Sequence, residues 1–218
     1  MRRFFRNNGL SITLLVVFLS LLAGQFATGR RVHNEERADE GEPPLSAAEY
    51  LVSPHFLEAT TENWESEFLQ MSMFVVLTVW LFQKGSAESN DPDEPAPSRK
   101  GRAHRHNSHA PWPVRRGGWV LRLYEHSLSL ALALVFLVSF AAHVVSGAAL
   151  YNEERLRQGE SPLMRWEYLH SSRFWFESLQ NWQSEFLAIG AMVVLTVFLR
   201  ERGSPESKRV ETPHGANE

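Results

Sequence analysis

The chain has 218 residues and a formal net charge of −3, and its length alone allows one or two domains. It has no cysteine, which excludes disulfide bonds, thiolate catalysis and cysteine-ligated metal sites. Its mean hydropathy of −0.26 is unremarkable, because long polar segments dilute four concentrated apolar runs.

The first apolar run, residues 10–28, contains no charged residue over 19 positions. A hydrocarbon core of about 30 Å needs about 20 helical residues, so this run predicts a transmembrane helix over 10–29. The basic residues Arg2, Arg3 and Arg6 before it are also typical of a cleaved signal peptide. The matching run later in the chain is internal, so we expect the first run to be retained as a membrane helix.

An outer loop follows, with the motif Asn-Glu-Glu-Arg at 34–37 and a polar turn at 41–44. Salt bridges from Arg37 to local acids would order this loop, at about 1 kcal/mol or less each. Binding of a cation or a lipid headgroup is the alternative. The aromatic and apolar residues after the turn predict a helix lying in the membrane interface, and Pro54 interrupts this pattern.

The second apolar run, residues 68–83, would form only about 24 Å of helix. It reaches the length of a membrane span only by starting near Asn63, which predicts a helix over 63–83. This start places Trp64 at the outer interface as an anchor and Glu67 about one turn from the hydrocarbon.

The segment 85–118 is rich in Pro, Ser and charged residues and lacks apolar periodicity, so it predicts a disordered linker. Its basic part favours contact with anionic lipid. It is too short and too mixed in sign to indicate nucleic-acid binding. Three histidines in it, His104, His106 and His109, have no fixed geometry and are a poor metal signal.

The second half of the chain repeats the first at a constant offset of 118 residues. The first repeat is therefore 1–84 and the second is 119–202, with helices predicted over 127–150 and 181–200 and a second interfacial anchor at Trp182. The polar tail, 203–218, is predicted to be disordered. Matched stretches are 34–37 with 152–155, 49–51 with 167–169, 66–69 with 184–187 and 75–79 with 193–197.

The predicted fold class is an all-α membrane protein with four transmembrane helices, arranged as two tandem parallel helical hairpins, each with an outer interfacial helix. Of 22 basic residues, 15 fall in 1–9, 83–126 and 200–218. The positive-inside rule then places the linker and both termini in the cytoplasm. Two helices per repeat give both repeats the same orientation.

Three motifs occur twice: Asn-Glu-Glu-Arg, Glu-Tyr-Leu and Asn-Trp-x-Ser-Glu-Phe-Leu. This pattern resembles a family of small, uncharacterised bacterial membrane proteins that is known only as a domain of unknown function. The resemblance covers nearly the whole chain apart from the linker and the tail. It implies an integral protein of the bacterial inner membrane and carries no activity with it.

The first candidate site is a pair of matched glutamates, Glu67 and Glu185. Asn63 and Asn181 lie four residues before them, so each pair shares one helix face. We expect the two glutamates to face each other, where two carboxyl groups in a low-dielectric site would hold a proton or a cation. The simpler interpretation is that these residues only begin helices.

The second candidate is the matched pair Gln25 and His143, inside the first and third helices. These side chains could hydrogen-bond across a helix interface, and a histidine can relay protons. The simpler interpretation is that His143 is a satisfied interhelical residue. Close helix packing is predicted by the small residues Gly24, Thr28, Ala142 and Ser146.

The sequence lacks a glycine-rich phosphate loop, a His-Glu-x-x-His motif and a nucleophile elbow. We therefore expect no catalytic residue, cofactor or metal, and a lipid bilayer as the main partner. The favoured function is a non-enzymatic envelope or interaction protein. The alternative is a small transporter or a proton- or cation-handling protein that uses Glu67 and Glu185, with a homodimer supplying enough helices; a membrane enzyme comes third.

Overall fold

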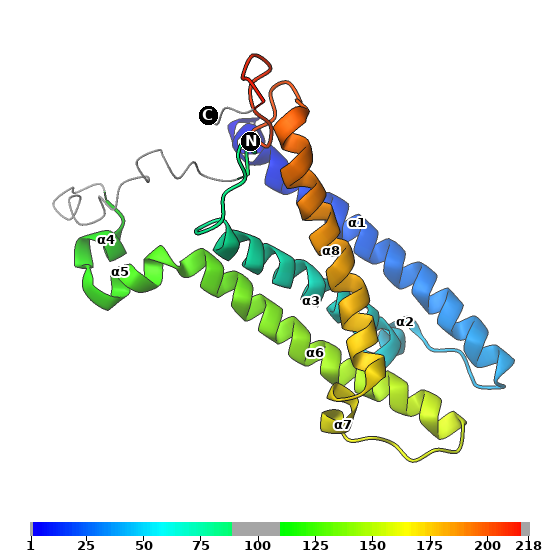
Figure 1. Ribbon diagram of the computed structural model, residues 1–218. Coiled ribbons are helices and arrows are strands. Elements are labelled where there is room, and N and C mark those ends of the chain that lie inside the picture. Colours follow the sequence, from blue (N-terminus) through cyan, green and yellow to red (C-terminus); the bar gives the residue numbers. More distant parts are fainter. Residues whose placement is uncertain (1, 89–109, 215–218) are drawn as a thin grey trace. The chain divides into compact units, whose positions relative to one another are not determined.

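The computed structural model describes residues 2–88 and 110–214, and this part of the chain contains helices and no strand (Figure 1). The predicted all-α fold is confirmed. The helices are α1 (Arg2–Asp39), α2 (Ala47–Leu51), α3 (Pro54–Leu77), α4 (Trp112–Arg116), α5 (Gly118–Glu125), α6 (Ser127–Arg157), α7 (Arg165–Leu169) and α8 (Ser172–Phe198).

Three helices of the described chain, not the predicted four, are long and apolar enough to cross a membrane: Phe4–Asp39 of α1, α6 and α8. The missing one is α3. It ends at Leu77 rather than near residue 83, so its uncharged run 68–77 is only about 15 Å long. The turns before this run carry four acidic residues, Glu58, Glu62, Glu65 and Glu67, which lower the hydropathy of any longer window.

The helices after the outer loops also begin earlier than predicted. We expected an interfacial helix that turns into a spanning helix near residues 63 and 181, but α3 and α8 run without a break from Pro54 and Ser172. The serine before each helix explains this start, because Ser53 and Ser171 accept a hydrogen bond from a backbone N–H of the first turn. Proline suits the first helical position, where its missing N–H costs nothing.

The described helices belong to two compact units. One unit, Met1–Thr61 with Ala142–Leu169, contains α1, α2, the first two turns of α3, the second half of α6 and α7. The other, Glu62–Ala141 with His170–Glu218, contains the remainder of α3, α4, α5, the first half of α6 and α8.

In the first unit an asparagine clamps each outer loop to the helix before it. Asn34 of α1 donates to the carbonyl of Leu45 (3.1 Å) and accepts from the N–H of the same residue (2.8 Å). Asn152 of α6 makes the same pair of bonds to Leu163, at 2.9 and 2.8 Å. One side chain thus satisfies both backbone groups of the residue that leads into the short helix.

The arginine of the same motif holds the turn. Arg37 forms an ion pair of 2.7 Å with Glu42, and Arg155 forms one of 2.7 Å with Glu160. Each arginine also donates through Nε to a carbonyl of its loop. The interpretation of Asn-Glu-Glu-Arg as a loop-ordering motif is therefore supported by matched contacts at both positions.

A buried tyrosine from each short helix packs against a glycine. Tyr50 of α2 and Tyr168 of α7 are each only 1% exposed. A Cβ atom added at Gly29 would overlap the Tyr50 hydroxyl, and one at Gly147 would overlap the Tyr168 hydroxyl. A glycine at these two positions is what lets the tyrosine lie flat against the long helix.

The small residues predicted to pack helices closely differ in the contacts that they make. No described residue comes within 4 Å of a Cβ built on Gly24, so the expected close contact is not found there. The hydroxyls of Thr28 and Ser146 bond to carbonyls of their own helices, those of Gly24 and Ala142, each at 2.8 Å. Ser146 also meets Thr61 of α3 at 3.3 Å.

The two predicted disordered segments are partly described. Of the linker 85–118, residues 89–109 lie outside the described residues, and α4 and the first residue of α5 occupy its end. In the tail, Arg200 donates to the carbonyl of Thr212 and Lys208 to that of His214, each at 3.1 Å. Residues 203–214 form turns without helix, and 215–218 lie outside the described residues.

Replacing Gly29 with alanine tests the tyrosine–glycine contact. Alanine favours a helix by about 1 kcal/mol over glycine, but overpacking against Tyr50 costs about 1–3 kcal/mol. We expect Gly29→Ala to lower the melting temperature in detergent and Gly24→Ala to leave it unchanged or raised. The double variant Gly29→Ala/Tyr50→Phe should recover stability. Equal melting temperatures for Gly29→Ala and Gly24→Ala would show that the contact is absent.

Candidate functional site

Two glutamates from different helices meet in the second unit. The Glu67 carboxyl of α3 and the Glu185 carboxyl of α8 are close enough to share a hydrogen bond. Two carboxyl groups can share a hydrogen bond only when one of them carries a proton, because an ionised carboxylate has no donor. The two glutamates occupy matched positions of the repeat, and their carboxyl groups come together from two helices.

Two more carboxyl groups of α3 bond to α8 beside this pair. Glu65 is fully buried and accepts from the indole Nε1–H of Trp182 at 3.0 Å. Glu62 accepts a hydrogen bond from the side-chain amide of Asn181. The residues expected to start the helix and to anchor it at the interface therefore act here as donors to carboxylates. We call Glu62, Glu65, Glu67 and Glu185 with these two donors the carboxyl seam.

The two helices of the seam carry different residues at several positions that the repeat matches. Glu67 and Glu185 occupy equivalent positions, but Glu62 and Glu65 correspond to Gln180 and Gln183 at the offset of 118. The seam thus takes three of its four glutamates from α3 and only Glu185 from α8. A buried carboxyl group needs a proton, a cation or a strong donor close by. Within the seam Glu65 is fully buried, Glu62 and Glu185 are half-buried, and Glu67 is exposed.

The other predicted residues are not joined to the seam by the described contacts. Asn63 and Trp64 of α3 are exposed, and Trp64 has 40% of its surface accessible. Gln25 donates to the Thr60 hydroxyl at 3.4 Å, and His143 is fully buried. Both of the latter belong to the first unit.

Sequence reasoning missed Glu62 and Glu65, although a signal was present. Glu58, Glu62 and Glu65 recur every three or four residues and so mark one acidic face of α3. It also missed the imidazoles His33 and His55, which the constant offset pairs with Tyr151 and Arg173. Comparing unlike residues at matched positions identifies both sets.

The bond between Trp182 and Glu65 gives a direct test of the seam. Trp182→Phe removes the indole N–H and leaves a fully buried carboxyl group without that donor, a loss of about 1–3 kcal/mol. We expect a clear fall in the melting temperature in detergent. The matched control is Trp64→Phe, which removes an exposed indole and should cost less.

A second variant separates the lost donor from a change in packing. Glu65→Leu combined with Trp182→Phe replaces both partners with apolar groups, which is close to neutral when shapes are retained. The double variant should therefore be more stable than Trp182→Phe alone. Similar losses for Trp182→Phe and Trp64→Phe, without recovery in the double variant, would contradict the contact.

Comparison with known proteins adds a family and no activity. No curated protein and no solved structure matches the chain. A family model described as "Domain of unknown function (DUF6766)" matches residues 1–218. This match confirms the expected kind of family. The chain, over its full length, belongs to the DUF6766 family of proteins of unknown function.

Proposed function

We propose that the protein is a non-enzymatic integral membrane protein that binds and exchanges a proton or a cation at the carboxyl seam. The observation that carries this proposal is the contact between the Glu67 and Glu185 carboxyl groups on two different helices. Ionisable groups inside or beside the hydrocarbon region are costly, and where they occur they mark sites of proton or ion handling.

The acids of the seam are contacted by neutral donors from α8. The Asn181 amide bonds to Glu62, and the indole N–H of Trp182 bonds to Glu65. A proton held between Glu67 and Glu185 is the smallest charge that makes their contact favourable. Carboxyl oxygens are also good ligands for hard cations, so Na⁺ or K⁺ can replace that proton.

The membrane arrangement follows the same reasoning. We place the protein in the bacterial inner membrane as two parallel hairpins, with the basic linker and both termini in the cytoplasm. Because α3 is not apolar enough to cross the bilayer alone, the first hairpin requires α8 to cover the acidic face of α3. The three contacts of the seam supply that cover for Glu62, Glu65 and Glu67.

The end of the linker and the start of the second repeat support contact with anionic lipid. The short helices α4 and α5 expose Trp112 and Trp119 beside Arg115, Arg116 and Arg122. The Arg116 guanidinium lies 5.2 Å from the centre of the Trp112 ring. Aromatic and basic side chains together are typical of segments at the headgroup level of a negatively charged leaflet. We further propose that the protein is a homodimer, because one chain has few helices with which to line a path for an ion across the membrane.

Proteoliposomes test the proposed exchange. Purified protein is reconstituted, and uptake of H⁺, Na⁺ or K⁺ is followed with a pH-sensitive dye inside the vesicles and with ion electrodes. We expect uptake by the wild type and its loss, to the level of protein-free vesicles, in Glu67→Gln/Glu185→Gln. Glu35→Gln removes an exposed acid outside the seam and should leave uptake unchanged.

Infrared difference spectra of the same samples report the shared proton directly. A protonated carboxyl band at neutral pH that disappears in Glu185→Gln supports the exchange site. Unchanged ion uptake in the double variant, or none in the wild type, would reject the proposal. The carboxyl seam would then only join helices, and the envelope or interaction role would be the better hypothesis.

A further inference from the structure

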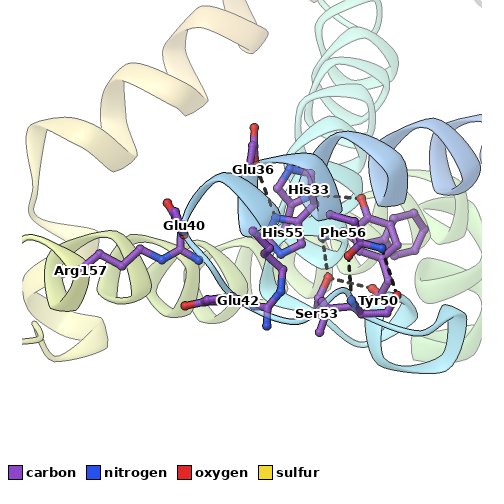
Figure 2. Close-up of polar contacts among 12 residues, drawn as sticks. His33, Glu36, Glu40, Glu42, Tyr50, Ser53, His55, Phe56 and Arg157 are labelled. Atoms are coloured by element: carbon purple, nitrogen blue, oxygen red, sulfur yellow. Dashed lines mark hydrogen bonds and ion pairs between the residues drawn. The ribbon is translucent and has the colours of Figure 1, made fainter.

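We propose that His33, Glu36 and His55 form a binding site for a divalent transition-metal ion of the Zn²⁺ class, at the junction of α1 and α3. This site uses none of the residues of the carboxyl seam and belongs entirely to the first unit. Figure 2 shows the two imidazole rings lying against each other next to Glu36, with Tyr50 and Phe56 beside them.

The three side chains already bring their ligand atoms together. One nitrogen of each imidazole and one oxygen of Glu36 lie within 4.8 Å of one another. The His33 Nδ1 atom is 3.6 Å from Glu36 Oε2, one helical turn away on α1. Ligand atoms about 2.0–2.1 Å from a tetrahedral Zn²⁺ are about 3.3 Å apart. Side-chain rotations that bring the ligand atoms about 1.5 Å or less closer together would therefore complete the coordination.

The donor set matches what this class of metal prefers. Two imidazoles and one carboxylate are a combination that binds Zn²⁺ and leaves a fourth position for water. The His33 and His55 rings are stacked with their centres 4.6 Å apart and their planes at 26°. Glu36 has 57% of its side chain exposed, so an ion can enter from solvent on that side.

A buried donor atom aims into this site. His33 is 5% exposed, and its buried Nδ1 makes no hydrogen bond with any described residue. A buried polar atom left unsatisfied costs about 1–3 kcal/mol. The Glu36 oxygen faces it from 3.6 Å, which is too long for a hydrogen bond and leaves room for an ion to draw the two atoms together.

The second imidazole is held by a residue behind it. The Tyr50 hydroxyl lies 3.0 Å from His55 Nδ1. Metal-bound histidines typically hydrogen-bond through their other ring nitrogen, which fixes the tautomer and the direction of the ring. Tyr50 is itself immobile, because it is 1% exposed and packs on Gly29. In the tautomer in which Nδ1–H of His55 donates to the Tyr50 hydroxyl, Nε2 is the nitrogen that coordinates the metal.

Buried and charged groups surround the two imidazoles. Burial lowers the pKa of His55, and the neighbouring His33 lowers this pKa further, while Glu36 opposes them. Glu153 of α6 is close enough to interact electrostatically with His33.

Comparison of the two repeats shows which residues of this site are not needed to form the loop. Glu36 and Tyr50 recur as Glu154 and Tyr168, whereas His33 and His55 become Tyr151 and Arg173. The same loop framework forms at both positions, so the imidazoles are not needed to build it. They occur together only in the first repeat, as expected for a ligand site added to one of two similar frameworks.

Zinc titration of the full-length protein in detergent, purified without a polyhistidine tag, tests the site. Calorimetry should show an equivalent of Zn²⁺ that binds at least 100-fold more weakly in His33→Tyr/His55→Arg, the residues natural to the second repeat. The linker histidines are present in both proteins, so the difference reports only the cluster. Melting in the presence of a chelator verifies that the variant folds.

Two further pairs of variants distinguish the loss of a metal ligand from a folding defect. Glu36→Gln changes an exposed ligand and should weaken Zn²⁺ binding, whereas Glu35→Gln on the same helix should not. Tyr50→Phe should weaken binding about 10- to 100-fold by freeing His55, whereas the matched Tyr168→Phe should have no effect. Co²⁺ bound at the site should give the visible spectrum of tetrahedral coordination.

Unchanged zinc stoichiometry and affinity in His33→Tyr/His55→Arg would overturn the proposal. Equal effects of Tyr50→Phe and Tyr168→Phe would overturn the assigned role of Tyr50. Because neither pair of variants touches the carboxyl seam, loss of zinc binding with normal ion uptake, or the reverse, distinguishes the two proposals.

Discussion

The loops after α1 and α6 depend on one side-chain amide near the end of each of these long helices. After α1 and α6 the chain must reverse direction, and the reversing residue carries a backbone donor and acceptor that would otherwise be unsatisfied. Asn34 and Asn152 satisfy both groups of Leu45 and Leu163 with almost the same distances. The position of the short helix follows from this clamp, and the buried tyrosine of that helix then packs against its glycine.

Because the chain contains two similar repeats, each repeat serves as a control for interpreting the residues of the other. Features found at both positions, such as the asparagine clamp, the Arg37–Glu42 pair and the Tyr50–Gly29 contact, are explained by the requirements of the loop. Residues that differ at matched positions need another explanation, because the same backbone forms without them. His33, His55, Glu62 and Glu65 are of this second kind: the two histidines belong to the proposed metal site and the two glutamates to the carboxyl seam.

The sequence predicts those features that depend on local chemistry. Charge-free runs identify α1 and α6, and the repeated Asn-Glu-Glu-Arg motif identifies the loops. Pro54 was misread as a break, because its effect depends on whether Ser53 caps the next turn, which is a matter of geometry. The reach of α3 was overestimated, since an apolar run of sequence does not reveal that the helix stops at Leu77. The Glu65–Trp182 bond joins residues far apart in the chain, so no local pattern could indicate it.

The acidic face of α3 connects stability to the proposed function. A helix with four glutamates in three turns is unfavourable in lipid, so its charge must be met by another part of the protein. Trp182 and Asn181 contribute neutral hydrogen bonds, each of which offsets less than the cost of burying an ionised carboxylate. Replacing those acids with leucine would remove that cost and would make α3 an ordinary membrane helix. Glu62 and Glu65 occur in only one of the two matched helices, although the helix itself forms without them, and this asymmetry is what the proposed exchange of a proton or a cation at the seam would explain.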